Sequence, residues 1–165
     1  MKIVTTRCSD YGMRAAVCLA GNDPQVLVTA AEISRETEIP QGFLHQVLQS
    51  LQRGGLVRST AGRRGGYALT RSAEDISVLE VLEALEGPLD LGECALRGGP
   101  CRWDDVCALH EVWSAGRSAF CDRLAASTLA DVARVDEQLK DGVYPVPADA
   151  HRLHRKREAE AEAEA

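Results

Sequence analysis

The chain of 165 residues has few aromatic side chains, 4% of the total, and no apolar run of the ~20 residues that a membrane-spanning helix needs. Its opening segment, MKIVTTRCSDYG, lacks the apolar core of a secretory signal peptide. The sequence also shows no nucleophile–base pair, no phosphate-binding loop and no paired carboxylates in a pocket-like context. These absences predict a cytoplasmic protein that is not an enzyme and has neither a membrane nor a small-molecule substrate as a partner.

Six cysteines in a chain expected in the cytoplasm indicate thiols or metal ligands, not disulfides. Cys94, Cys101 and Cys107 lie with His110 in the loop-like segment GECALRGGPCRWDDVCALH, spaced C-x6-C-x5-C-x2-H. Thiolates are preferred ligands of iron–sulfur clusters and of zinc, and an imidazole can complete either set. The gaps between the cysteines are longer than in zinc knuckles. The spacing therefore favours a cluster, with a closed zinc site and three unbound thiols as alternatives.

The net charge of −6 argues at first against a nucleic-acid partner, but the charge is unevenly distributed. Residues 1–72 hold nine Lys/Arg and five Asp/Glu, a net charge of +4, whereas the remainder holds ten and twenty, a net charge of −10. No acidic residue occurs from Gln41 to Ser72, where five arginines lie: Arg53, Arg58, Arg63, Arg64 and Arg71. This asymmetry predicts a localised anionic partner for the basic half.

Helical periodicity predicts a helix-turn-helix in the basic half. A first helix is expected to start between Thr5 and Ser9 and to run to about Ala20, and a second opens at a capping box of Thr29 and Glu32. The first helix should bury one face, which carries Tyr11, Ala15, Cys18 and Leu19.

The third helix, about Gln41–Arg53, is expected to carry an apolar stripe opposite a polar one. The polar stripe has no acid and no lysine and consists of Gln41, His45, Gln49 and Gln52. Glutamine can bind adenine and histidine can donate to guanine in the major groove, so we predict that this stripe reads bases. A solvated helix face is the alternative.

A hairpin is expected after the third helix, because two short β-like runs, Leu56–Ser59 and Tyr67–Thr70, flank the loop TAGRRGG. Its tip carries Arg63 and Arg64, which can reach phosphates or enter the minor groove. With Arg58 on the first run, these arginines form the predicted DNA-binding set of a wing. Arginines that only serve solubility are the alternative.

Three further helices are expected beyond the wing, at Val78–Glu86, about Leu109–Ala125 and about Leu129–Leu139. The first opens at a capping box of Ser77 and Glu80. The chain ends in EAEAEAEA, a low-complexity run without an apolar face.

Four segments together resemble the IscR/NsrR-type family of dimeric winged-helix regulators: SDYGMRA (Ser9–Ala15), GRRGGYALT (Gly62–Thr70), CALHEVW (Cys107–Trp113) and STLADV (Ser127–Val132). The resemblance extends over about residues 1–140. It implies a homodimer that binds operator DNA, with the long helix forming much of the dimer contact. It also implies an iron–sulfur cluster that senses nitric oxide, oxidants or cluster supply.

This resemblance leaves the fourth cluster ligand open. The IscR-like pattern implies a [2Fe-2S] cluster held by the three cysteines and His110, and the NsrR-like pattern implies a [4Fe-4S] cluster held by the cysteines and the partner subunit's Asp10. Because the whole SDYGMRA segment matches the NsrR-like opening, Asp10 and [4Fe-4S] are favoured. The chain departs from the family in three places. Six residues separate the first two cysteines where five are common, His45 replaces a glutamate of IscR, and Ala61 replaces a frequent wing arginine.

The sequence is thus interpreted as mainly α with a small β-wing. The expected organisation is a winged helix-turn-helix domain (1–87), a cluster-binding loop (88–110), dimerisation and C-terminal helices (109–140) and a flexible tail (141–165). The expected function is a repressor that responds to its cluster. A zinc-stabilised or cluster-free thiol-based DNA-binding regulator is the alternative, and an iron–sulfur redox enzyme or electron carrier is the alternative from another class.

Overall fold

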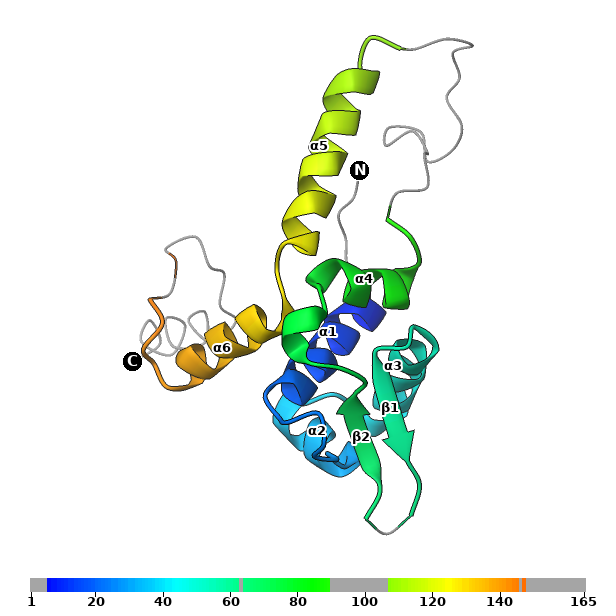
Figure 1. Cartoon of the computed structure of the whole chain (residues 1–165), viewed down its shortest axis with the longest axis vertical. Helices are drawn as coiled ribbons and strands as arrows, with labels where there is room; N and C mark the ends of the chain where they lie inside the picture. The colour runs from blue at the N-terminus through cyan, green and yellow to red at the C-terminus, as the bar shows by residue number, and fades with distance from the viewer. Residues whose placement is uncertain (1–5, 63, 90–106, 146, 148–165) are drawn as a thin grey trace, which may run out of the picture. The chain divides into compact units, whose positions relative to one another are not determined.

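The structure, a computed structural model, describes residues 6–62, 64–89, 107–145 and 147. It separates into two compact units, residues 1–134 and 135–165, which are taken separately. The elements in chain order are α1 (Arg7–Ala20), α2 (Ala30–Thr37), α3 (Gln41–Arg53), β1 (Val57–Thr60), β2 (Gly66–Leu69), a 3-10 turn (Ala73–Asp75), α4 (Val78–Glu86), α5 (His110–Ala125) and α6 (Leu129–Lys140) (Figure 1). None of the described helices is long and apolar enough to cross a membrane.

The helix boundaries follow from local capping. Thr6 accepts hydrogen bonds from the backbone N–H groups of Cys8 and Ser9 and so begins α1. The predicted capping box of Thr29 and Glu32 is formed at the start of α2, with both reciprocal bonds present. These signals act within four residues, so the sequence predicts the helix starts well.

The turn between α2 and α3 is tight. Glu38 ends α2 in the left-handed conformation, with φ +55° and ψ +25°, and Pro40 precedes the first residue of α3. Between them Ile39 is buried in the core. A buried residue in a short turn fixes the angle between two helices, and α2, the turn and α3 form the predicted helix-turn-helix.

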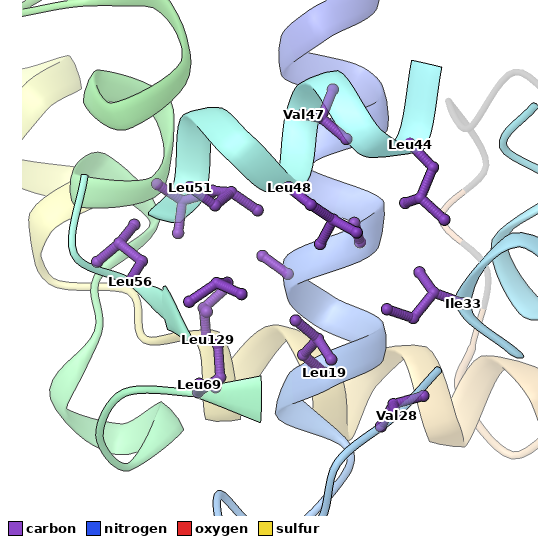
Figure 2. Close-up of a cluster of buried hydrophobic side chains, with 14 of the residues drawn as sticks. Leu19, Val28, Ile33, Leu44, Val47, Leu48, Leu51, Leu56, Leu69 and Leu129 are labelled. Atoms are coloured by element: carbon purple, nitrogen blue, oxygen red, sulfur yellow. The ribbon is translucent and has the colours of Figure 1, made fainter. Parts of the chain in front are cut away.

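The core of the first unit is built by apolar side chains from α1, α2, α3, the hairpin and the start of α6 (Figure 2). Leu44, Val47, Leu48 and Leu51, the predicted apolar stripe of α3, are all buried in it. They meet Leu19, Val28, Ile33, Leu56, Leu69 and Leu129. One buried stripe on α3 leaves the opposite face of that helix outside the core.

The buried face of α1 differs in part from the prediction. Ala15 and Leu19 are buried as expected, whereas Tyr11 and Cys18 are half-buried. Ser9 and Gly12 are buried in their place because α4 packs closely on this face. An ideal Cβ on Gly12 would lie 2.4 Å from Leu85 Cδ2, so a larger residue here would require the Leu85 side chain to move.

The hairpin is the predicted wing, with each strand displaced by one residue from its expected bounds. β1 and β2 are antiparallel, in a register that pairs Val57 with Leu69 and Thr60 with Gly66. The hairpin lies beside α3 (Figure 1). β1 starts one residue later than expected because the N–H of Leu56 donates to Leu51 O (3.0 Å), in the hydrogen-bonded turn that ends α3.

The start of α4 is joined to the start of α6. Ser77 and Glu80 form the predicted capping box of α4. Backbone hydrogen bonds run from Val78 N to Ser127 O and from Leu129 N to Ile76 O, each 2.8 Å long. These bonds place Leu129 in the core, although it is distant in sequence from the other core residues.

In the second unit the described residues are the end of α6 and the turn after it. Gly142, at φ +71°, ends the helix, and the N–H of Val143 donates to Gln138 O (2.9 Å). Of the predicted flexible tail (141–165), only residues 141–145 and 147 are described.

Candidate functional site

The exposed face of α3 is the first part of the candidate site. Gln41, His45 and Gln49, the predicted base-reading residues, are all exposed. The opposite, buried stripe of α3 holds this face outward. An exposed face with glutamine and histidine and without an acid suits the major groove, where these side chains pair with base edges.

The fourth member of the predicted stripe has another role. Gln52 is half-buried, and its Nε2 donates to Ser59 Oγ at 2.8 Å. It therefore ties the end of α3 to strand β1 and fixes the wing relative to the helix.

One exposed residue of this face was missed by the sequence reasoning. Gln46 is exposed and lies on α3 between His45 and Gln49. A stripe drawn at every fourth residue skips this position. A helical wheel of 100° per residue would have found it, because Gln46 falls close to Gln49 and opposite the buried leucines.

The wing is the second part of the candidate site. Its base is anchored by an isolated bridge between Val28 and Tyr67, in which each N–H donates to the other residue's oxygen (2.9 and 2.8 Å). Gly66 is required there, because a Cβ would lie 2.6 Å from Val28 O. Arg64 is exposed on the loop, whereas Arg63 lies outside the described residues.

The arginines of the basic half differ in what they contact. Arg71 pairs with Glu80, whose pKa is lowered by the N–H and hydroxyl of Ser77 and by Arg71 itself, so this positive charge is already compensated. Arg58, on β1, donates from Nη2 to Pro24 O at 2.9 Å. A carbonyl bond leaves the charge of Arg58 uncompensated. Arg58 and Arg64 therefore contribute to a positive surface beside α3.

The cysteine segment is described only at its end. Cys94 and Cys101 lie outside the described residues, and Cys107 is half-buried just before α5. The N–H of His110, the first residue of α5, donates to Cys107 O (3.0 Å), so these two predicted ligands share one turn. Within the described ranges, no group of three or more His, Cys, Asp or Glu side chains is arranged to hold a metal ion.

Asp10, the alternative fourth ligand, is exposed on the first turn of α1. Its carboxylate pairs with Arg14 Nη2 at 3.0 Å. Arg14 also donates to Thr37 O (2.8 Å), at the end of α2, and lies 5.1 Å from the ring centre of Tyr11. Asp10 is thus connected through one guanidinium to the helix-turn-helix.

The two cysteines of α1, Cys8 and Cys18, contact neighbouring residues of the fold. Burial, and then the carboxylate of Glu86, raise the pKa of the Cys8 thiol, which disfavours the reactive thiolate. Cys18 donates from Sγ to Glu36 Oε2 (3.4 Å). Glu86 itself accepts hydrogen bonds from the hydroxyls of Thr6 and Ser9, and these bonds lower its pKa. The end of α4 is thereby joined to the start of α1.

Comparison with known proteins agrees with this arrangement. Residues 5–135 match the Rrf2 family model, described as an iron-dependent transcriptional regulator. The HTH-type protein Rv1287 of Mycobacterium tuberculosis is 38% identical over 130 residues, 76% of this chain and 78% of that protein.

Two solved structures share the fold. CymR, titled the global cysteine regulator of B. subtilis, has a TM-score of 0.68 at 25% identity, over 81% of this chain and 98% of that chain. T. potens IscR has a TM-score of 0.64 at 25% identity, over 94% of this chain and 98% of that chain. The relatives and structural neighbours are transcriptional regulators, which confirms the prediction that the chain is not an enzyme. The redox-enzyme alternative is therefore wrong. The chain belongs to the Rrf2 family of winged-helix transcriptional regulators.

Proposed function

We propose that the chain binds operator DNA as a homodimer in the cytoplasm and acts as a repressor whose affinity depends on an iron–sulfur cluster. The exposed face of α3, with Gln41, His45 and Gln49 and no acid, is the observation that carries the DNA-binding part. Arg58 and Arg64 beside it supply positive charge for phosphates. In this arrangement contacts of α3 with bases supply sequence specificity, and contacts of the wing with the DNA backbone supply affinity.

The homodimer is supported by α5. None of its 16 residues is buried within the described chain, and Val112 and Trp113 are 70% and 36% exposed. A helix with large apolar side chains in water is typical of an interface. In a dimer the two α3 helices reach half-sites about one helical turn apart, so a small change in their spacing removes much of the affinity.

The donor set fits an iron–sulfur cluster chemically, since Cys94, Cys101 and Cys107 supply three thiolates. When bound, such a cluster supplies a centre that changes on reaction with nitric oxide or oxidants. His110 is near Cys107 in the same turn, and Asp10 is the candidate that lies in the winged part. We favour Asp10 and a [4Fe-4S] cluster. Ligation by Asp10 would compete with its ion pair to Arg14. It would thereby affect the guanidinium that also donates to Thr37 O at the end of α2.

Cofactor identity is tested on full-length protein purified without oxygen, by iron and sulfide analysis with absorption and Mössbauer spectra. Bound iron and sulfide are expected. We expect Asp10→Ala to change the spectrum and His110→Ala to leave it intact; the reverse result would contradict Asp10 as the ligand. A colourless protein with stoichiometric zinc would contradict the cluster.

The regulatory part is tested by DNA binding of the loaded, nitric-oxide-treated and Cys107→Ala proteins, with circular dichroism as the folding control. Tight binding by the loaded form alone is expected. Equal affinity in all three would leave the cysteine segment without a regulatory role.

A cluster-free thiol regulator is the second candidate, and the structural likeness to CymR favours it. It predicts a protein without iron whose DNA affinity nevertheless changes on thiol oxidation. The metal analysis above separates the two candidates before any DNA is added.

A further inference from the structure

The first turn of α3 carries an apolar side chain on an otherwise polar surface. Phe43 is 45% exposed, although it is flanked along the helix by Gln41, Gly42, His45 and Gln46, which are exposed as well. The N-terminal residues of a recognition helix are those that contact base edges. Phe43 lies in this first turn and is not one of the buried core residues.

Gly42, next to it, has no structural reason to be glycine within the described chain. An ideal Cβ on Gly42 would meet nothing within 4 Å, and the residue has an ordinary helical backbone. Glycine weakens a helix relative to alanine, so it is a cost at this position unless something outside the chain approaches the backbone closely. Gly42 thus provides clearance beside Phe43 on the exposed face.

The ring of Phe43 is held in place by α1. It packs edge-to-face on Tyr11 of α1, with ring centres 5.7 Å apart and planes at 65°. Tyr11 in turn lies against the guanidinium of Arg14, which is anchored at Thr37 O. An aromatic ring fixed in this way presents an apolar surface at little entropic cost on binding.

We propose that Phe43 reads thymine, by packing its ring against the 5-methyl group in the major groove, with Gly42 giving the base pair room to approach. The thymine methyl is the apolar feature of the major groove, and phenylalanine is one of the side chains that contact it. Wedge insertion between bases is a minor-groove device, which a helix seated in the major groove does not use. The assignment rests on the proposed DNA-binding function and adds to it one specificity-determining residue.

The experiment begins with duplexes chosen by in vitro selection from a random library with the full-length protein. Each thymine of the selected site is then replaced by deoxyuridine, which removes only the methyl group. We expect about a four-fold loss of affinity at one thymine in each half-site, the size expected for burying one methyl group. In Phe43→Ala the affinities for the thymine and uracil duplexes should be equal, whereas Phe43→Leu should keep part of the difference.

Val26→Ala is the matched control, because Val26 is an exposed apolar residue, 50% accessible, in the turn between α1 and α2. It should leave the thymine-to-uracil ratio unchanged. Gly42→Ala should raise the unfolding midpoint yet weaken binding about ten-fold, which separates a lost fit to DNA from a lost fold.

The assignment would be overturned if no thymine-to-uracil change lowers wild-type affinity, or if the ratio persists in Phe43→Ala. Failure to select any duplex is a different result, since it would overturn the proposed DNA binding itself and the assignment with it. A dimer contact by Phe43 would lower the association constant of Phe43→Ala and leave the ratio intact, which also refutes the reading of thymine.

Discussion

Replacing Gly54 by alanine tests how closely α3 and α4 are packed. Gly54 ends α3 with φ −73°, an ordinary value, so alanine meets no backbone strain there. Its Cβ would lie 2.5 Å from Ala84 Cβ and 3.4 Å from Ala84 Cα. Ordinary contacts at such atoms are 3.4–4 Å, and no rotamer change can move either Cβ. The two helices must therefore separate by about 1 Å.

The expected cost is about 2 kcal/mol in the free energy of unfolding, within the range of about 1–3 kcal/mol for overpacking a core. The expected fall in melting temperature is roughly 4–8 °C for a chain of this size. Urea unfolding followed by circular dichroism measures the change, at one fixed protein concentration because dimerisation adds to stability.

A double-mutant cycle identifies the cause of this loss. Ala84→Gly alone should cost about 1 kcal/mol, through helix propensity in α4. The double variant Gly54→Ala/Ala84→Gly should also cost only about 1 kcal/mol, because the two methyl groups no longer overlap. Gly42→Ala is the control in the same helix, since its Cβ meets nothing, and it should stabilise by about 0.5–1 kcal/mol. Additive losses, or a Gly54→Ala protein as stable as wild type, would refute the close approach.

Three other changes have defined outcomes. Glu38→Gly should stabilise the fold by about 0.5–1 kcal/mol in urea unfolding, because Glu38 occupies the left-handed region; no gain would contradict that conformation. The pKa of Glu86 is lowered by Thr6 and Ser9, so its contribution is present above its unfolded pKa and is lost as pH falls through the folded pKa. Glu86→Gln should therefore reduce the fall in urea midpoint between pH 6 and pH 3, and an unchanged pH profile would argue against the hydrogen bonds. Arg64→Ala should lower the salt slope of DNA binding by about one for each protomer bound, whereas Arg123→Ala should leave it unchanged.

Sequence reasoning succeeded where the signal was local. The capping boxes at Thr29 and Ser77 and the bounds of α3 depend on residues within one or two turns, and each was predicted correctly. Ser9 is different, because its burial is explained by Glu86, a partner 77 positions away. The local sequence around a polar residue on an apolar face does not indicate that a distant carboxylate will accept its hydrogen bond.

The candidate site was also predictable only where its features depend on local helical periodicity. The exposure of Gln41, His45 and Gln49 follows from the periodicity of α3. The bond from Gln52 to Ser59 depends on how the hairpin folds back on the helix, which periodicity does not contain. The proposed cluster ligands Cys94 and Cys101 stay predictions, because they lie outside the described residues.

The burial of Leu129 has a consequence for the order in which the core is completed during synthesis. A ribosome releases the chain from its N-terminus, so the helix-turn-helix and the wing emerge first. Leu129, fully buried among their core residues, is synthesised later. The three thiols of the cysteine segment precede Leu129 in the chain. A nascent copy therefore completes the core behind α3 only after its cysteine segment has been synthesised.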